Sequence, residues 1–208
     1  MDTRQAYNRW AEQYDTNVNK TRDLEAIALR RTLANKKFNR ILEIGCGTGK
    51  NTEWLQTISR EMVAVDLSEE MLAKAKEKIT AASVSFRQAD ITQDWTFAEG
   101  SFDLITFSLV LEHIEDLHPI FDKAARLLRT NGRIYIGELH PFKQYAGTKA
   151  RFETEQGTQV VPCFNHHVSD FTKAALQRSL VIEQLDEYFD DEANAIIPRI
   201  LTLLLRKN

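Results

Sequence analysis

The chain has 208 residues, with 27 basic and 30 acidic side chains and a formal net charge of −3. This length fits one domain, and the slightly acidic balance argues against nucleic acid as a partner. No apolar run reaches the roughly 18–20 residues that cross a bilayer, and the polar N-terminus carries no signal-peptide core. We therefore expect a single domain over 1–208, located in the cytoplasm, with no membrane and no nucleic-acid partner.

Short apolar runs alternate along the chain with amphipathic stretches. Residues 1–35 favour two helices that cap one edge of the fold or the mouth of a site, and helical patterns cover 69–79 and 117–129. This alternation is typical of an α/β fold with a mostly parallel sheet and helices on both faces. The last two strands are joined too closely for a crossover helix, so they should pair antiparallel. The predicted strands are 40–45, 61–66, 83–88, 102–108, 132–139, 181–189 and 199–207.

The stretch ILEIGCGTGKNTEW places three glycines, Gly45, Gly47 and Gly49, between the first strand and a helix-like pattern. Glycine tolerates positive φ and lets a ligand approach the backbone, whereas a plain tight turn rarely needs three of them. A dinucleotide loop, G-x-G-x-x-G, would have its third glycine where Lys50 stands. The acid Glu43 inside the strand disfavours a pyrophosphate and favours a ligand with an ammonium or sulfonium group.

Acidic residues follow the next two strands. Asp66 ends the second strand, 21 residues after Gly45, where a carboxylate can accept both ribose hydroxyls. The alternative role, capping the following helix, suits Ser68 better. Asp90 ends the third strand and can accept from an adenine amino group, while the N–H of Ile91 faces the same base. The series predicts a nucleoside site at the carboxyl ends of the strands.

In order and spacing, the motifs ILEIGCGTGKNTEWL, VAVDLSEEML, RQADI, FAEGSFDLITFSLVLEHIEDL and LLRTNGRIYIGEL resemble those of class I S-adenosylmethionine (SAM)-dependent methyltransferases, chiefly the small-molecule group. The resemblance runs from about residue 7 to 140. It implies a Rossmann-like sheet of seven strands in the order 3-2-1-4-5-7-6, with SAM as cofactor. The implied cofactor residues are Tyr14, Glu43, Gly45, Cys46, Gly47, Gly49, Asp66, Leu67, Asp90, Ile91, Ser108 and Leu109.

Methyl transfer from SAM needs an acceptor aligned in line with the leaving sulfur, and a general base only where the acceptor loses its proton late. His113, a few residues after the fourth strand, is the candidate base, and a packing role is its alternative. A covalent role for Cys163 is not needed by this chemistry. His113 and His118 lie five residues apart, which does not place them on one helical face, so no metal site is predicted.

After the fifth strand, segments on either side of Gln156-Gly157 read as a β-hairpin, for which the core sheet has no place. We expect residues 141–168 to form an insertion that covers the acceptor pocket. The candidate acceptor residues in and beside this segment are His140, Tyr145, Arg151 and His167, although an arginine alternating with acids is also typical of an exposed hairpin face.

The sequence therefore predicts a SAM-dependent methyltransferase that transfers the methyl group in line to an O, N, S or C atom of a small-molecule acceptor. Two alternatives remain open. One is a SAM-binding module without catalysis, and the other is a nicotinamide-dependent oxidoreductase, which the Lys50 position disfavours. Neither the methylated atom nor the oligomeric state follows from the sequence.

Overall fold

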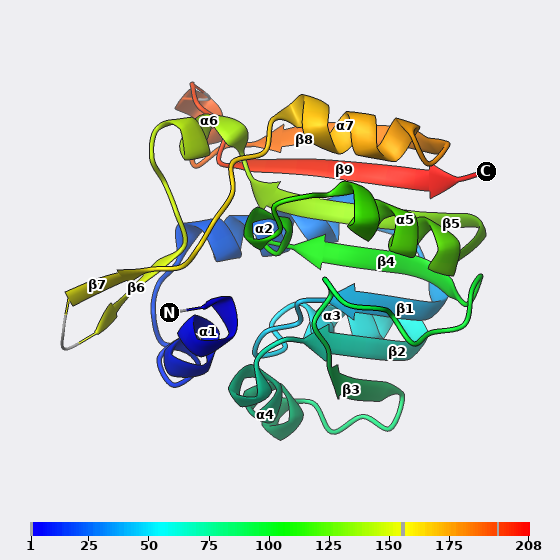
Figure 1. Cartoon of the computed structure of the whole chain (residues 1–208), viewed down its shortest axis with the longest axis horizontal. Helices are drawn as coiled ribbons and strands as arrows, with labels where there is room; N and C mark the ends of the chain where they lie inside the picture. Colours follow the sequence, from blue (N-terminus) through cyan, green and yellow to red (C-terminus); the bar gives the residue numbers. More distant parts are fainter. Residues whose placement is uncertain (1, 155–156, 195) are drawn as a thin grey trace.

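A seven-stranded mixed sheet forms the centre of the computed structural model, which describes residues 2–154, 157–194 and 196–208. Its strand order is β3-β2-β1-β4-β5-β9-β8, and β9 is antiparallel to both of its neighbours (Figure 1). This confirms the predicted fold and the antiparallel pairing of the last two strands. The strands are β1 (Phe38–Ile44), β2 (Ser59–Asp66), β3 (Val84–Gln88), β4 (Phe102–Ser108), β5 (Leu128–Leu139), β8 (Leu180–Tyr188) and β9 (Ile200–Lys207).

Helix α4 (Glu69–Lys78) begins where the sequence supplies a cap. Ser68 accepts a hydrogen bond from the backbone N–H of Met71 at 3.1 Å, and two glutamates occupy the first turn of α4, as the sequence predicts. The helices are α1 (Thr3–Trp10), α2 (Lys20–Thr32), α3 (Thr52–Leu55), α4 (Glu69–Lys78), α5 (His118–Leu127), α6 (Pro141–Tyr145) and α7 (Val168–Leu176), with short 3-10 turns η1 (Gln56–Ile58), η2 (Leu111–His113) and η3 (Glu192–Asn194).

The junction of α5 and β5 differs from the prediction. The helix ends at Leu127 and the strand begins at Leu128, four residues before the predicted start at 132. The predicted turn residues lie inside the strand. Asn131 has a positive φ of 61° there, and the pairing with β4 shifts register between Phe102 and Leu104, as at a β-bulge.

Both faces of the sheet are covered, which explains why its central strands are apolar on both sides. On one face, α5 and α7 pack against side chains that include Leu42 and Ile44 of β1. On the other face, α2, α3 and α4 pack against the alternate set, which includes Ile41. None of the helices in the described residues combines the length and apolar character needed for a bilayer crossing.

The carboxyl ends of the parallel strands carry a second, smaller layer made from α1 and a β-hairpin (Figure 1). The predicted hairpin is present, with β6 (Arg151–Thr154) paired antiparallel to β7 (Gly157–Val160), while Gln156 lies outside the described residues. Trp10 of α1 stacks on Phe152 of β6, with ring centroids 5.2 Å apart. The hairpin is therefore attached to the N-terminal helix, and its role as a cover for the acceptor stays a prediction.

Candidate active site

A cavity of about 580 Å³ opens at the carboxyl ends of β1, β2 and β4. It brings together residues from six separate segments of the chain. Most of the predicted cofactor residues line it, and so does the candidate base. These predicted lining residues are Tyr14, Gly45, Gly47, Asp66, Leu67, Asp90, Ile91, Ser108, Leu109 and His113.

Two of the three loop glycines are required by packing. Gly45 has a φ of +72°, and a Cβ there would lie 2.2 Å from a methyl group of Val110. Gly49 has a φ of +86°, and its Cβ would lie 2.8 Å from the Cδ1 of Ile79. Gly49 therefore lets the loop approach the end of α4 and does not line the cavity, unlike the cofactor contact that the resemblance implies.

Asp66 fixes the glycine loop to the end of β2. One of its carboxylate oxygens accepts the backbone N–H of Gly47 at 2.8 Å, and the other accepts the N–H of Ser68 at 2.9 Å. Each oxygen keeps a further lone pair, and the residue lines the cavity. Burial raises the pKa of Asp66, while the three backbone N–H groups around it act in the opposite direction.

The loop after β3 is held by a lysine that the sequence does not single out. The ammonium of Lys123 on α5 donates to three consecutive carbonyls, those of Ile91, Thr92 and Gln93, at 2.9, 3.0 and 2.6 Å. The carboxylate of Asp90 accepts the N–H of Thr92 at 2.9 Å. Lys123 is only 9% exposed, so it is a buried clamp on the loop that carries the two predicted adenine contacts.

A smaller pocket adjoins the main cavity and shares Tyr14, Gly45 and Gly47 with it. Glu43 and Cys46, which are predicted cofactor residues outside the main cavity, line this smaller pocket, and Gly49 lines neither pocket. Glu43 accepts from the hydroxyl of Thr52 at 2.5 Å, and burial raises its pKa to about 8. Arg22, Glu25 and Asn51 also line it, although nothing in their sequence spacing pointed to a site.

The smaller pocket contains polar atoms without a protein partner. Within the described residues, the Nε of Arg22 and the side-chain oxygen of Asn51 are buried and form no hydrogen bond. The amide nitrogen of Asn51 donates to Glu25 at 2.8 Å, and the hydroxyl of Tyr135 donates to the same carboxylate at 3.1 Å. Unpartnered buried donors and acceptors are costly, which indicates that a polar ligand completes this pocket.

His113 also lines the main cavity. Its Nδ1 lies 2.8 Å from the carbonyl oxygen of Pro162, which can only accept, so Nδ1 carries the proton. Its Nε2 therefore accepts from the hydroxyl of Tyr7 at 2.8 Å. Burial lowers the pKa of His113 and raises the pKa of Tyr7, so both groups are neutral near pH 7.

The four predicted acceptor residues do not line the main cavity of the ligand-free structure, and their role stays a prediction. His140 is buried and caps α6, because its Nδ1 accepts the N–H of Phe142 at 3.2 Å while its Nε2 donates to Glu187 at 2.8 Å. Tyr145 donates to the Nδ1 of His167 at 2.5 Å. Arg151 is exposed on the hairpin. The cavity wall is formed instead by residues nearer the N-terminus, among them Thr3, Arg4 and Tyr7.

Known methyltransferases are similar to this chain in sequence. Residues 42–136 match the family described as "Methyltransferase domain". The chain is 29% identical to the ubiquinone biosynthesis O-methyltransferase of Xanthomonas oryzae pv. oryzae (strain PXO99A), over 73% of this chain and 63% of the relative. It is 28% identical to the protein of the same name from Xanthomonas axonopodis pv. citri, over 65% and 57% respectively. The chain thus spans less than two thirds of the length of these curated relatives.

Solved structures share the fold. A SAM-dependent methyltransferase from Mesorhizobium loti superposes with a TM-score of 0.74 at 21% identity, over 87% of this chain and 96% of that one. The N-methyltransferase NodS from Bradyrhizobium japonicum, solved with S-adenosyl-L-homocysteine, gives a TM-score of 0.73 at 20% identity, over 100% and 99%. The sheet order matches the fold of these methyltransferases, and residues 42–136, which include the glycine loop, are similar to the methyltransferase family.

Proposed function

We propose that this chain transfers the methyl group of SAM to a small-molecule acceptor. The observation that carries the proposal is one cavity that is lined by two groups of residues with different chemistry. The glycine loop, Asp66 and Asp90 form a wall suited to a nucleoside, and Tyr7 with His113 forms a wall suited to a group that loses a proton. The names of relatives include both O- and N-methyltransferases, so the methylated atom is not assigned.

The residues present fit SAM in three parts. Asp66 would accept from the ribose hydroxyls, and the loop of Asp90 and Ile91 would bind the adenine edge. The smaller pocket would take the methionine end, where Arg22 can donate to the carboxylate and the unpartnered oxygen of Asn51 can accept from the ammonium. Glu43 adds a carboxyl group to the same pocket, and a carboxyl group there favours a cationic ligand.

Bound SAM supplies an electrophilic methyl group, and the chain has to place the acceptor behind it. Ser108 and Leu109 line the cavity at the end of β4, between the two walls. Positioning of this kind can account for roughly 7–11 kcal/mol of a bimolecular barrier. Residues that shape the cavity should therefore matter as much as any acid or base.

A proton route exists for an acceptor with a hydroxyl group. An acceptor next to Tyr7 can pass its proton to the phenol oxygen, while Tyr7 passes its own proton to the Nε2 of His113. The Nδ1–H of His113 donates to the carbonyl of Pro162, which fixes the orientation of the ring. His113 thereby keeps the base role that the sequence suggested, with Tyr7 as the group that meets the acceptor. The cytoplasmic location and the absence of a nucleic-acid partner stay predictions.

Formation of S-adenosylhomocysteine is the direct test. The protein should be incubated with SAM and a panel of small phenols, carboxylates, amines and thiols, and the product measured by mass spectrometry. We expect product with one acceptor class and none with a Gly45→Val variant, whose side chain would collide with Val110. Tight SAM binding without product from any acceptor would favour a non-catalytic SAM-binding module.

A further inference from the structure

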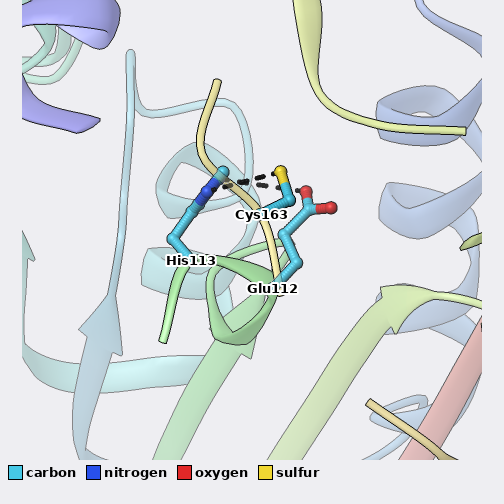
Figure 2. A group of neighbouring side chains, drawn as sticks. All are labelled: Glu112, His113 and Cys163. Carbon is cyan, nitrogen blue, oxygen red and sulfur yellow. Dashed lines mark hydrogen bonds and ion pairs between the residues drawn. The ribbon is translucent and has the colours of Figure 1, made fainter. Parts of the chain in front are cut away.

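Three different metal-binding side chains meet beside the main cavity, which one of them, His113, lines. Glu112 and His113 belong to η2, which follows β4, and Cys163 follows β7, yet the three side chains point toward one another (Figure 2). Their ligand atoms all lie within 4.8 Å of one another. The side chains of Glu112 and His113 are 7% and 8% exposed, so the cluster is mostly shielded from solvent.

The three side chains are close enough for a modest contraction to bring their ligand atoms around one ion. The sulfur of Cys163 lies 3.7 Å from the Nδ1 of His113, and an oxygen of Glu112 lies 3.9 Å from its Nε2. With Zn–S near 2.3 Å and Zn–N near 2.0–2.1 Å, tetrahedral ligand atoms lie roughly 3.3–3.6 Å apart. The three ligand atoms lie within 4.8 Å of one another, so a contraction of up to about 1.5 Å would close the site around an ion.

The surroundings of the cluster also suit a metal ligand. Metal-bound histidines usually donate their second ring N–H to a carbonyl or carboxylate, and His113 donates its Nδ1–H to Pro162. The N–H of Phe164 donates to the carbonyl of Glu112 at 2.7 Å, which fastens the two chain segments together on either side of Cys163. The ligands are thus held by backbone contacts that an incoming ion need not break.

The charge balance of the cluster also favours a bound cation. Glu112 is 6% exposed, and within the described part of the chain no lysine or arginine forms an ion pair with it. This buried carboxyl group lies next to the partly buried thiol of Cys163, without a paired lysine or arginine among the described residues to balance a negative charge. A divalent ion would supply that balance, because loss of one proton from each group gives a complex without net charge.

We propose that Glu112, His113 and Cys163 bind one divalent transition-metal ion of the zinc type, with a coordination position open to the cavity. Thiolate and imidazole ligands favour zinc or cobalt over magnesium or calcium. Three protein ligands with a free position are the pattern of catalytic zinc sites. The ion would take the Nε2 lone pair that now accepts from Tyr7, which leaves the Tyr7 side of the ion facing the cavity.

The open position has a consequence that rests on the proposed function. An acceptor hydroxyl or thiol that binds there loses its proton to solvent more readily, and the methyl group then bonds to the oxygen or sulfur while the sulfonium becomes a neutral thioether. His113 cannot be a ligand and a free base at once, so the ion and the Tyr7–His113 proton route are alternatives within one site. The sequence predicted no metal site, because Cys163 lies 50 residues from His113 and only the fold joins them.

Cobalt(II) provides a spectroscopic test. Chelator-treated protein titrated with Co²⁺ should bind one equivalent and develop the charge-transfer absorption of a cobalt–thiolate bond. Cys163→Ser should abolish that band, and Glu112→Gln should weaken cobalt binding at least about tenfold. Cys46→Ser, which changes the other free cysteine, should keep the band. No stoichiometric band in the wild type, or a band that survives in Cys163→Ser, would overturn the proposal.

Two further measurements separate this proposal from the proposed function. Thermal unfolding of each variant checks its folding, and if Cys163→Ser does not fold, cobalt affinity in Glu112→Gln decides. Methyl transfer by metal-loaded and metal-stripped protein is then compared, with SAM affinity measured by calorimetry. One bound cobalt ion without any product would keep the metal site and reject the methyltransferase. Equal turnover of loaded and stripped protein would reject the role of the open position.

Discussion

Asp66 serves two structural needs at once. Its two oxygens hold the backbone N–H groups of Gly47 and Ser68, so the carboxylate orders the glycine loop and the start of α4 before any ligand binds. The same oxygens line the cavity where ribose would lie. Loss of this side chain should therefore weaken ligand binding both directly and through the loop.

Asp66→Ala should weaken the binding of SAM roughly 10- to 100-fold, because hydrogen bonds to a charged group contribute about 1.5–3 kcal/mol each. S-adenosylhomocysteine carries the same ribose and should lose affinity by a similar factor. Asp66→Asn, which keeps the shape and one acceptor oxygen, should lie between the wild type and the alanine variant. Calorimetry with both ligands measures the effect, and unchanged affinities would remove Asp66 from the site.

Tyr7 can be tested with a single-atom change. Tyr7→Phe keeps the ring packed against Trp10, at a centroid distance of 5.7 Å, but removes the hydroxyl that donates to His113. If the proton route operates, turnover should fall by about 10²-fold or more while SAM affinity stays within about twofold. Steady-state kinetics and calorimetry on one preparation give both values. Equal turnover would show that the acceptor proton leaves by another path.

At the scale of elements, the loop after β3 depends on α5. Lys123 reaches from α5 to three consecutive carbonyls of that loop, and its ammonium also lies 5.7 Å from the ring centre of Trp95. All three of its donors are used, so the lysine orients the backbone without touching the cavity itself. Lys123 is therefore a positioning residue for the predicted adenine contacts.

Lys123→Met should raise the dissociation constant of SAM about tenfold and leave turnover at saturating SAM near the wild-type value. The three freed carbonyls should also lower the free energy of unfolding by about 1–3 kcal/mol. Lys76→Met, on the exposed face of α4, is the matched control and should change neither quantity. A loss of stability with unchanged SAM affinity would show that Lys123 supports the fold alone.

The elements also show why some site residues could be predicted and others could not. Gly45, Asp66 and Asp90 lie at or just after the ends of strands that the apolar pattern predicts, and parallel strands bring their carboxyl ends to one edge. Arg22 and Lys123 reach the site from the helices α2 and α5. In a helical sequence pattern, a charged residue that faces a site cannot be distinguished from one that faces solvent. The role of His140 stays a prediction, and in this structure its side chain caps α6, which its sequence position did not reveal.

The insertion after β5 illustrates the same limit. Its turn chemistry predicted the hairpin, which the structure contains. Its docking partner could not be predicted, because the stack of Phe152 on Trp10 joins segments about 140 residues apart. Residues of α1 and η2 line the main cavity, and no described residue of the hairpin strands does.

For the molecule as a whole, the carboxyl edge of the sheet concentrates buried acids. Burial raises the pKa of Glu43 to about 8 and that of Glu138 to about 8, and Glu112 and Glu25 add repulsion at Glu138. One oxygen of Glu138 accepts the N–H groups of Val110 and Leu111 at 2.9 and 2.8 Å, while the other is buried and has no hydrogen-bond partner among the described residues. The ligand-free protein therefore carries unfavourable negative charge here whenever these groups ionise.

The stability of the ligand-free protein should consequently depend on pH in a definite direction. A carboxyl group whose pKa is about 8 when folded and near 4.5 when unfolded binds its proton more tightly in the folded state. Its contribution is fully present below pH 4.5 and is lost as the pH rises through 8, at about 1.4 kcal/mol per pH unit between the two values. The melting temperature should therefore fall between pH 5 and pH 8.5.

Glu138→Gln should flatten this dependence, because the amide stays neutral while its oxygen still accepts the two N–H groups of η2. The variant should match the wild type near pH 5 and unfold at a higher temperature than the wild type at pH 8.5. Glu77→Gln, an exposed change on α4, should leave the wild-type profile intact. Calorimetric melting curves at four pH values decide. Parallel profiles for wild type and Glu138→Gln would mean that Glu138 ionises as readily in the folded chain as in the unfolded one.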